Sequence, residues 1–186
     1  MTATEIEDML VRERWHHGTT MPRYTPRQWW ECDVAELTGA GYLREYEIKL
    51  SRQDFRADAH KEAYFLHNRK NKHELLAQRS PVGPCQFWFV APANVLPLSI
   101  IPEWAGLYEV RKEDRPYARA YLYEVKKAPR LHDTKVTPEV RDHMVGVAYY
   151  RFHNLAAKHR RMQMASVKHA KLLRAFGWPK VKPALR

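Results

Sequence analysis

The sequence has few cysteines and no long apolar run. Its two cysteines, Cys32 and Cys85, stand among apolar residues of expected strands, and neither belongs to a Cys-x-x-Cys pair. This pattern argues against a disulfide framework or a zinc site, so both thiols are interpreted as core groups. No apolar run approaches the roughly 18 residues of a membrane-spanning helix. The acidic first residues do not resemble a signal peptide, so we expect a cytoplasmic protein with no membrane partner.

Motifs of other enzyme classes are also missing. The sequence contains no Gly-x-Ser-x-Gly and no phosphate-binding glycine loop, which argues against serine hydrolases and NTPases. The ten histidines show no ligand spacing, since His16 and His17 are adjacent rather than one helical turn apart.

Acidic residues are absent from the last quarter of the chain. Residues 1–142 contain 22 Lys and Arg and 21 Asp and Glu, whereas residues 143–186 contain ten Lys and Arg and no acid. The net charge of +11 therefore lies almost entirely after residue 142. A lysine or arginine near a phosphate releases condensed counterions and strengthens binding. Nucleic acid is the first candidate partner.

What the sequence does contain is a hairpin that carries two acids and a lysine. Residues 29–38 and 42–50 are typical of strands, and Gly-Ala-Gly between them predicts a tight turn. A turn centred on Ala40 places Asp33 opposite Glu47, at about 4.5–5.5 Å between Cβ atoms. The same register places Glu31 opposite Lys49.

Strand alternation predicts a charged face and an apolar face for the second strand. The charged face carries Glu45, Glu47 and Lys49, and the apolar face carries Tyr46, Ile48 and Leu50. We expect the apolar face to be buried and the charged face to meet a cleft or water.

Two carboxylates this close repel each other, and a proton, an arginine or a divalent cation relieves the repulsion. Mg²⁺ fits, because it accepts one or two carboxylates and fills its other positions with water and substrate phosphate. Lys49 would then stand beside a metal-bound water, where its ammonium group could orient that water or offset the charge that develops on an attacked phosphate. These parts favour metal-assisted phosphodiester hydrolysis. The alternative is a solvated sheet face, and a register slip of one residue would turn Asp33 away.

The order of acid, hairpin, Glu-x-Lys strand and helix resembles the PD-(D/E)XK nuclease superfamily. Asp33 matches its first acid, Glu47 its second acid and Lys49 its lysine. The similarity extends over roughly residues 28–110 and is greatest to the MmcB-like DNA-repair branch. The segments that carry it are residues 31–34, 47–58, 87–92 and 101–107.

The resemblance implies an α/β restriction-endonuclease-like mixed sheet flanked by helices, and a bound Mg²⁺ or Mn²⁺. Asp33, Glu47 and the backbone carbonyl of Ile48 would hold this ion, with Lys49 assisting the attacking water. Cys32 stands where a proline often precedes the first acid, but that proline has no chemical role.

Members of the superfamily often carry a further glutamate on the first helix. The expected helix at residues 4–14, with Thr4 as its cap, offers Glu5 as a metal ligand, while Glu7 and Glu13 compete for that role. The alternative for Glu5 is a favourable interaction with the helix dipole.

A helix is expected after Ser51, whose hydroxyl caps it together with Asp54. Its buried stripe would be Phe55, Ala59, Ala63 and Leu66, continuing into a helical or basic segment at residues 67–79. Lys61 on this helix is a candidate cleft and nucleic-acid contact, with a solvated position as the alternative. Residues 16–28 are expected to form a loop or irregular edge, and residues 85–91, 106–111 and 118–126 to form strands.

A long basic helix is expected from Thr137-Pro138-Glu139 to Gly177 and Pro179. Its apolar stripe is Met144, Val147, Ala148, Phe152 and Leu155, and its candidate nucleic-acid contacts are Lys158, Arg160, Arg161, Lys168, Lys171 and Arg174. The alternative is a solvated face that packs on the core. We expect a nuclease-like domain at residues 1–131 and a basic helical extension at residues 132–186.

Together these features predict a metal-dependent deoxyribonuclease in DNA repair, recombination or phage DNA processing. The alternatives are a non-catalytic nucleic-acid-binding protein on a nuclease-like scaffold and an RNA-processing endonuclease. Paired active sites are common among similar enzymes, so a homodimer is also compatible with the resemblance.

Overall fold

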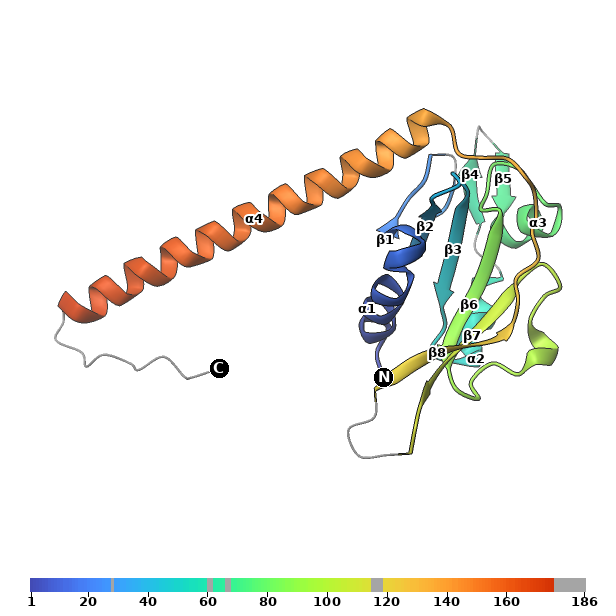
Figure 1. Ribbon diagram of the computed structural model, residues 1–186, viewed down its shortest axis with the longest axis horizontal. Helices are drawn as coiled ribbons and strands as arrows, with labels where there is room; N and C mark the ends of the chain where they lie inside the picture. Colours follow the sequence, from blue (N-terminus) through green and yellow to red (C-terminus); the bar gives the residue numbers. More distant parts are fainter. Residues whose placement is uncertain (28, 60–61, 66–67, 115–118, 176–186) are drawn as a thin grey trace. The chain divides into compact units, whose positions relative to one another are not determined.

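The expected hairpin forms the second and third strands of a six-stranded mixed sheet (Figure 1). In the computed structural model, strand β2 spans Cys32–Thr38 and strand β3 spans Leu43–Ile48. They pair antiparallel with Val34 opposite Tyr46, which is the register expected from the sequence. Gly41 in the turn has a φ of 87°, a left-handed conformation that glycine adopts without strain. The hairpin and its register are confirmed.

Four further strands complete the sheet: β1 (Gly18–Tyr24), β6 (Gln86–Pro92), β7 (Gly106–Lys112) and β8 (Ala120–Lys126). Their order is β1-β2-β3-β6-β7-β8. Strand β6 is parallel to β3 and to β7, and the other neighbours are antiparallel. The three later strands lie where the sequence predicts them.

Strand β1 corrects the expectation of a loop or irregular edge. It pairs with β2 at the edge of the sheet. A Cβ atom on Gly18 would lie 2.2 Å from the carbonyl oxygen of Leu37, so the close approach of these strands requires glycine. Pro22 has no N–H to donate, which an edge strand tolerates. Glycine and proline are atypical of strands, which is why the pattern was missed.

Helices cover both faces of the sheet (Figure 1). Helix α1 (Ala3–Arg14) packs on one face, in a core that includes Ile6, Met9, Leu10, Val34, Tyr46, Ile48, Trp88 and Val90. Helices α2 (Arg52–Asp58) and α3 (Lys72–Ala77) lie against the other face. There the ring of Phe55 is centred 4.8 Å from that of Phe89. The expected α/β class is confirmed.

Helix α1 is capped by Thr2 rather than by Thr4. The Thr2 hydroxyl accepts a hydrogen bond from the N–H of Glu5, and the Glu5 carboxylate accepts one from the N–H of Thr2. This reciprocal pair is a capping box. The cap expected at Thr4 was therefore wrong by two residues.

Helix α2 is shorter than expected. Ser51 caps it as predicted, accepting from the N–H of Asp54 at 3.0 Å. The helix ends at Asp58, and the chain continues into a small hairpin of β4 (Glu62–Phe65) and β5 (Asn68–Asn71). The helical stripe expected to pass through Ala63 was wrong, because Ala63 lies in β4. Lys61 and Leu66 lie outside the described residues.

The structure describes residues 1–27, 29–59, 62–65, 68–114 and 119–175, without the side chains at 63–65, 68–69 and 167–175. The chain divides into two compact units after Met144. Residues 132–144 belong to the first unit, since the N–H of Val136 donates to the carbonyl of Gly41 at 2.9 Å and Met144 is buried.

Helix α4 spans Pro138–Ala175 and begins where Thr137-Pro138-Glu139 predicts it. Gly177 and Pro179, which were expected to end it, lie outside the described residues. Across the described ranges, no helix is long and apolar enough to cross a membrane.

Candidate functional site

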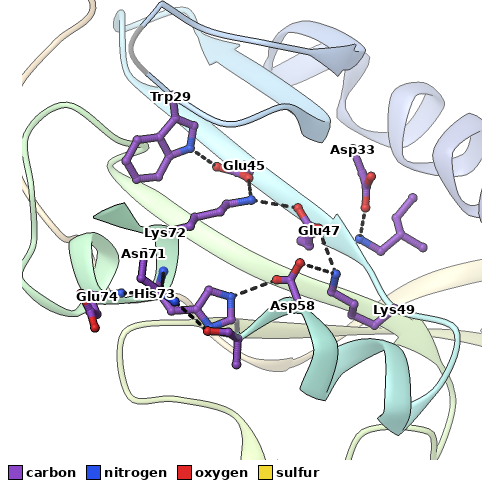
Figure 2. A network of polar contacts seen from close by, with 12 residues as sticks. Trp29, Asp33, Glu45, Glu47, Lys49, Asp58, Asn71, Lys72, His73 and Glu74 are labelled. Carbon is purple, nitrogen blue, oxygen red and sulfur yellow. Dashed lines mark hydrogen bonds and ion pairs between the residues drawn. The ribbon is translucent and has the colours of Figure 1, made fainter. Parts of the chain in front are cut away.

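A network of ion pairs and hydrogen bonds covers one face of β3 (Figure 2). Glu45 and Glu47 stand on this face with exposed fractions of 0% and 2%. The expectation that the charged face meets a cleft or water was wrong, because Lys72 at the start of α3 reaches both carboxylates. A cation from a helix distant in sequence compensates the buried charge.

Lys49 directly follows β3 and contacts two carboxylates. Its Nζ lies 2.9 Å from Oε1 of Glu47 and 2.9 Å from Oδ1 of Asp58 in α2. Glu47 and Lys49 therefore meet, as strand alternation predicts. Glu31, expected opposite Lys49, is exposed and precedes β2, outside the ladder between β2 and β3.

Asp33 shares the face of Glu47. Ala35 is the cross-strand partner of Glu45, and alternation puts Asp33 and Glu47 on the same side of the sheet. Oδ2 of Asp33 accepts a hydrogen bond of 2.7 Å from the N–H of Ile48. Burial, followed by the negative charge of Glu47, raises the pKa of Asp33 to about 6. A cation placed near both carboxylates would relieve this penalty.

Lys72 is the other cation of the network. Its ammonium group contacts Oε1 of Glu45 and lies 3.0 Å from Oε2 of Glu47. Burial alone would lower the pKa of Lys72, but the charges of Glu45 and Glu47 raise it above its usual value. Lys72 therefore remains protonated in the folded protein.

Glu45 is held from two sides. Its Oε2 accepts a hydrogen bond of 2.7 Å from Nε1 of Trp29, while Oε1 faces Lys72. Burial raises the pKa of Glu45, although the charge of Lys72 opposes the rise. Both of its oxygens are thus engaged by groups of the protein.

Asp58 connects Lys49 to an aromatic cluster. Its Oδ2 lies 2.9 Å from Nε2 of His73, and the His73 ring packs edge-on against Phe89 and Trp104. Asp58 thereby orients the Lys49 ammonium and is itself positioned by His73.

Sequence reasoning assigned no role in the site to Asp58, Lys72 or His73. Asp58 lies in the Asp-Phe-x-x-Asp run of the resemblance, which was the available signal. Nothing local distinguishes Lys72 from the other lysines of its segment.

Glu5 is not brought together with Asp33 and Glu47. It is exposed, and its helix packs on the opposite face of the sheet. Hydrogen bonds from the backbone and side chain of Thr2 lower the pKa of Glu5. The structure gives Glu5 a capping role.

Asp33 and Glu47 are the two carboxylates that would hold a hydrated divalent ion, but Lys49 and Lys72 donate to the two oxygens of Glu47, so ion binding requires Glu47 to give up one of these contacts. In the described ranges, no three Asp, Glu, His or Cys side chains form a ready metal-binding group. Two carboxylates suffice for Mg²⁺, which keeps several waters and binds through one or two protein oxygens. The raised pKa of Asp33 indicates a desolvated anion that such a cation would stabilise.

Of the residues on α4 that were expected to contact nucleic acid, only some have side chains that the structure describes. Lys158, Arg160 and Arg161 are exposed. The side chains of Lys168, Lys171 and Arg174 lie outside the description.

Comparison with known proteins adds one structural likeness. No family model and no curated protein matches the chain. Among solved structures it is similar to the SPO1766 protein of unknown function from Silicibacter pomeroyi, with 24% identity, 88% of each chain covered and a TM-score of 0.47.

Proposed function

We propose that this chain is a Mg²⁺- or Mn²⁺-dependent nuclease that hydrolyses DNA phosphodiester bonds in the cytoplasm, in DNA repair, recombination or phage DNA processing. One observation carries the proposal: Asp33 and Glu47 share a sheet face where the Lys49 ammonium lies 2.9 Å from Glu47. The set contains two oxygen donors for a hard cation and a fixed positive charge beside them, which suits attack of water on a phosphodiester.

Each residue has a distinct task in this mechanism. Asp33 and Glu47 would hold the ion, which supplies Lewis-acid activation of water and phosphate when bound. Lys49 carries a positive charge that stabilises the negative charge developing on the attacked phosphate. Asp58 holds the Lys49 ammonium at 2.9 Å, which reduces the reorganisation needed during the reaction.

One observation favours the second candidate, a non-catalytic nucleic-acid-binding protein. Glu47 is 2% exposed, and each of its carboxylate oxygens faces a lysine ammonium group. Its charge is therefore compensated by the protein alone. Such a scaffold would bind DNA with the same affinity in the presence and absence of metal, and would not cut it.

Cleavage assays separate these candidates. Linear, circular and branched DNA and a labelled RNA are incubated with the full chain, with and without Mg²⁺ or Mn²⁺. The wild type is expected to cut DNA only with metal, and Glu47→Ala and Lys49→Ala to lose at least about 100-fold in rate while still binding DNA. Cleavage of RNA alone would instead identify the RNA-processing endonuclease.

A matched variant controls for contamination and for general effects of charge removal. Glu31→Ala removes an exposed acid that directly precedes β2 and lies outside the ladder between β2 and β3, and it should cut like the wild type. Glu47→Ala removes the shared partner of two buried lysines, so melting curves must accompany it. Equal cutting by folded Glu47→Ala and wild type would refute the nuclease assignment.

A further inference from the structure

Helix α4, which is continuous over Pro138–Ala175 (Figure 1), exposes a row of large apolar side chains. Val145, Phe152, Leu155 and Met162 have exposed fractions between 59% and 70%. Single apolar residues on a surface are normal, but a contiguous apolar patch marks an interaction site. Most of the stability of a helix in a protein also comes from packing such a face against another element. The row therefore indicates a surface that a partner covers.

The spacing of this row is that of a coiled coil. Steps of three and four residues alternate without interruption along the helix, through Val145, Ala148, Phe152, Leu155, His159, Met162 and Ser166. These are the a and d positions of three successive heptads and the first a position of a fourth. A helix keeps such a row on one face when it winds slightly around a second helix. The row therefore fits a helical partner.

Positive charge is absent from this face. Residues 145–166 contain four cations, and all of them lie outside the row, at the g, b and c positions: Arg151 and Lys158 at g, Arg160 at b and Arg161 at c. The e positions on the other side of the row hold no charge, since they are Tyr149, Ala156 and Gln163. A partner selected by its acidic side chains would need cations on the docking face. This face is neutral and apolar, and so matches a copy of itself.

A second copy of α4 complements the row in the parallel orientation. In a parallel pair, a g residue of one helix faces the e residue of the following heptad on the other helix. Arg151 would then face Ala156, and Lys158 would face Gln163. In an antiparallel pair g residues face g residues, which would bring Arg151 and Lys158 of the two copies together and cause repulsion. Parallel pairing avoids this repulsion.

The size of the contact predicts a reversible dimer. The row from Val145 to Ser166 is about 33 Å long on a helix about 10 Å wide. Interdigitated side chains over this length bury on the order of 1,000 Å² in total, which is close to the lower limit of a specific interface. The polar residues His159 and Ser166 at a positions weaken the packing further. Association is therefore expected at micromolar protein concentrations.

We propose that two copies of this chain form a parallel dimer through the a and d side chains of α4. Arg160 and Arg161, at b and c, face outward in this dimer and stay accessible to a polyanion. The interface lies in the second unit of the chain, so the inference goes beyond the proposed nuclease activity and does not depend on it.

Sedimentation equilibrium of the full chain, without DNA or metal, tests the dimer over a concentration series. We expect the mass to rise from the 22.1 kDa of one chain to twice that value. Leu155→Lys places a charge at a central d position and should weaken dimerisation at least about 100-fold. The matched control is Met164→Lys, because Met164 is 74% exposed at the outward f position. This control should dimerise like the wild type.

A gain of affinity provides a second measurement that loss of folding cannot mimic. His159→Ile replaces a polar a residue with the β-branched residue that favours two-stranded coiled coils, and it should tighten the dimer at least about tenfold. An unchanged or weaker dimer in this variant would overturn the assignment of His159 to the interface and with it the register of the row.

Cysteine variants test the orientation. In a parallel dimer the Leu155→Cys side chains of the two copies face each other within disulfide distance, so mild oxidation should produce a covalent dimer. Met164→Cys faces outward and should remain uncrosslinked. The native Cys32 and Cys85 are buried, which keeps the background low. Equal crosslinking of the two variants would overturn the parallel arrangement.

Salt separates this dimer from other uses of the same helix. Each copy carries a net charge of +11, so salt that screens the repulsion should strengthen dimerisation, whereas salt weakens binding to a polyanion. A wild type that keeps the mass of one chain up to about 1 mM would overturn the inference, as would a Leu155→Lys dimer as tight as the wild type. Binding of the monomeric chain to vesicles of anionic lipid, lost in Leu155→Lys, would overturn it as well. A dimer that does not cut DNA would support the inference and refute only the nuclease proposal.

Discussion

Buried charges on the face of β3 are balanced by residues from other elements. Glu47 meets Lys49 at the end of its own strand and Lys72 from α3, and Lys49 meets Asp58 from α2. Asp33 differs from these residues, because the carboxylate accepts a hydrogen bond from the neutral N–H of Ile48 and not from a charged group. Its ionisation in the folded protein is therefore unfavourable in the absence of a further cation.

Asp33→Asn should stabilise the metal-free protein at neutral pH. The folded-state pKa of Asp33, about 6 against an ordinary 3.8, means that the charged form costs stability, on the order of 1–2 kcal/mol above the folded pKa. The cost disappears at low pH, where the carboxyl group is protonated in both states. Asparagine keeps an oxygen for the Ile48 N–H without the charge. Urea unfolding at pH 4 and 7.5 measures the difference.

The same variant should lose stabilisation by metal. Mn²⁺ is expected to raise the melting temperature of the wild type and to have much less effect on Asp33→Asn, because a metal that binds only the folded state stabilises it. A variant that is less stable than wild type at pH 7.5 without metal would contradict the interpretation of Asp33 as a strained anion.

The sequence predicted those residue pairs of the site that lie within one hairpin. The Gly-Ala-Gly turn determined the register that places Asp33 beside Glu47, and alternation put Lys49 on the same face. Lys72 and Asp58 could not be found this way, because their contacts join separate elements. Such contacts depend on how helices pack on the sheet, which local patterns do not specify.

The buried carboxylate of Glu36 connects helix α1 to the sheet through hydrogen bonds and ion pairs. Its Oε2 accepts from Nε of Arg14 in α1 at 3.0 Å and from the hydroxyl of Tyr46, and its Oε1 faces NH1 of Arg44 at 3.1 Å. Glu36 is 0% exposed. This cluster lies on the sheet face opposite the candidate site. Its role is therefore to stabilise the fold and not to take part in the proposed reaction.

Glu36→Ala should destabilise the protein by about 3–5 kcal/mol, because it leaves two guanidinium groups and a hydroxyl without their shared acceptor. The control Glu31→Ala, at an exposed acid, should change stability by no more than about 0.5 kcal/mol. Chemical denaturation monitored by tryptophan fluorescence measures both. Similar midpoints for the two variants would show that Glu36 does not anchor α1.

Element boundaries were predictable where the caps are local. Ser51 begins α2 and Thr137-Pro138 begins α4, as expected. The end of α2 was not predictable, because residues after Asp58 keep helix-compatible spacing while their backbone pairs as β4 and β5. Tertiary pairing overrides such weak local preferences.

The excess of positive charge and the candidate site lie in different parts of the chain. The acids of the candidate site lie in the first unit, while the residues after 142 carry ten Lys and Arg and no acid. Lys158, Arg160 and Arg161 on α4 are exposed. Alternation and helical spacing predicted the central hairpin, the three later strands and the long C-terminal helix, but not β1, β4 or β5. The identity of an anionic partner was not predictable either, because positive charge attracts any polyanion.

Replacing Lys158, Arg160 and Arg161 with alanine should weaken DNA binding and reduce the slope of log affinity against log salt by up to about 3. The control is a triple alanine variant at three exposed cations of the first unit, Arg12, Lys112 and Lys127. It should change the salt slope less than the α4 variant does. Fluorescence anisotropy across a salt series measures both proteins. An unchanged slope in the α4 variant would exclude these three side chains as phosphate contacts.

The most direct test is the single-turnover rate of cleavage of labelled duplex DNA by wild type and Glu47→Gln in Mn²⁺. The isosteric amide keeps the shape of the side chain and removes the charge that would hold the ion. We expect cutting by the wild type that stops when the metal is chelated, and a rate at least about 100-fold lower for Glu47→Gln at unchanged DNA affinity. Equal rates for the two proteins, or cutting that survives chelation, would contradict a metal-dependent nuclease site at Asp33, Glu47 and Lys49.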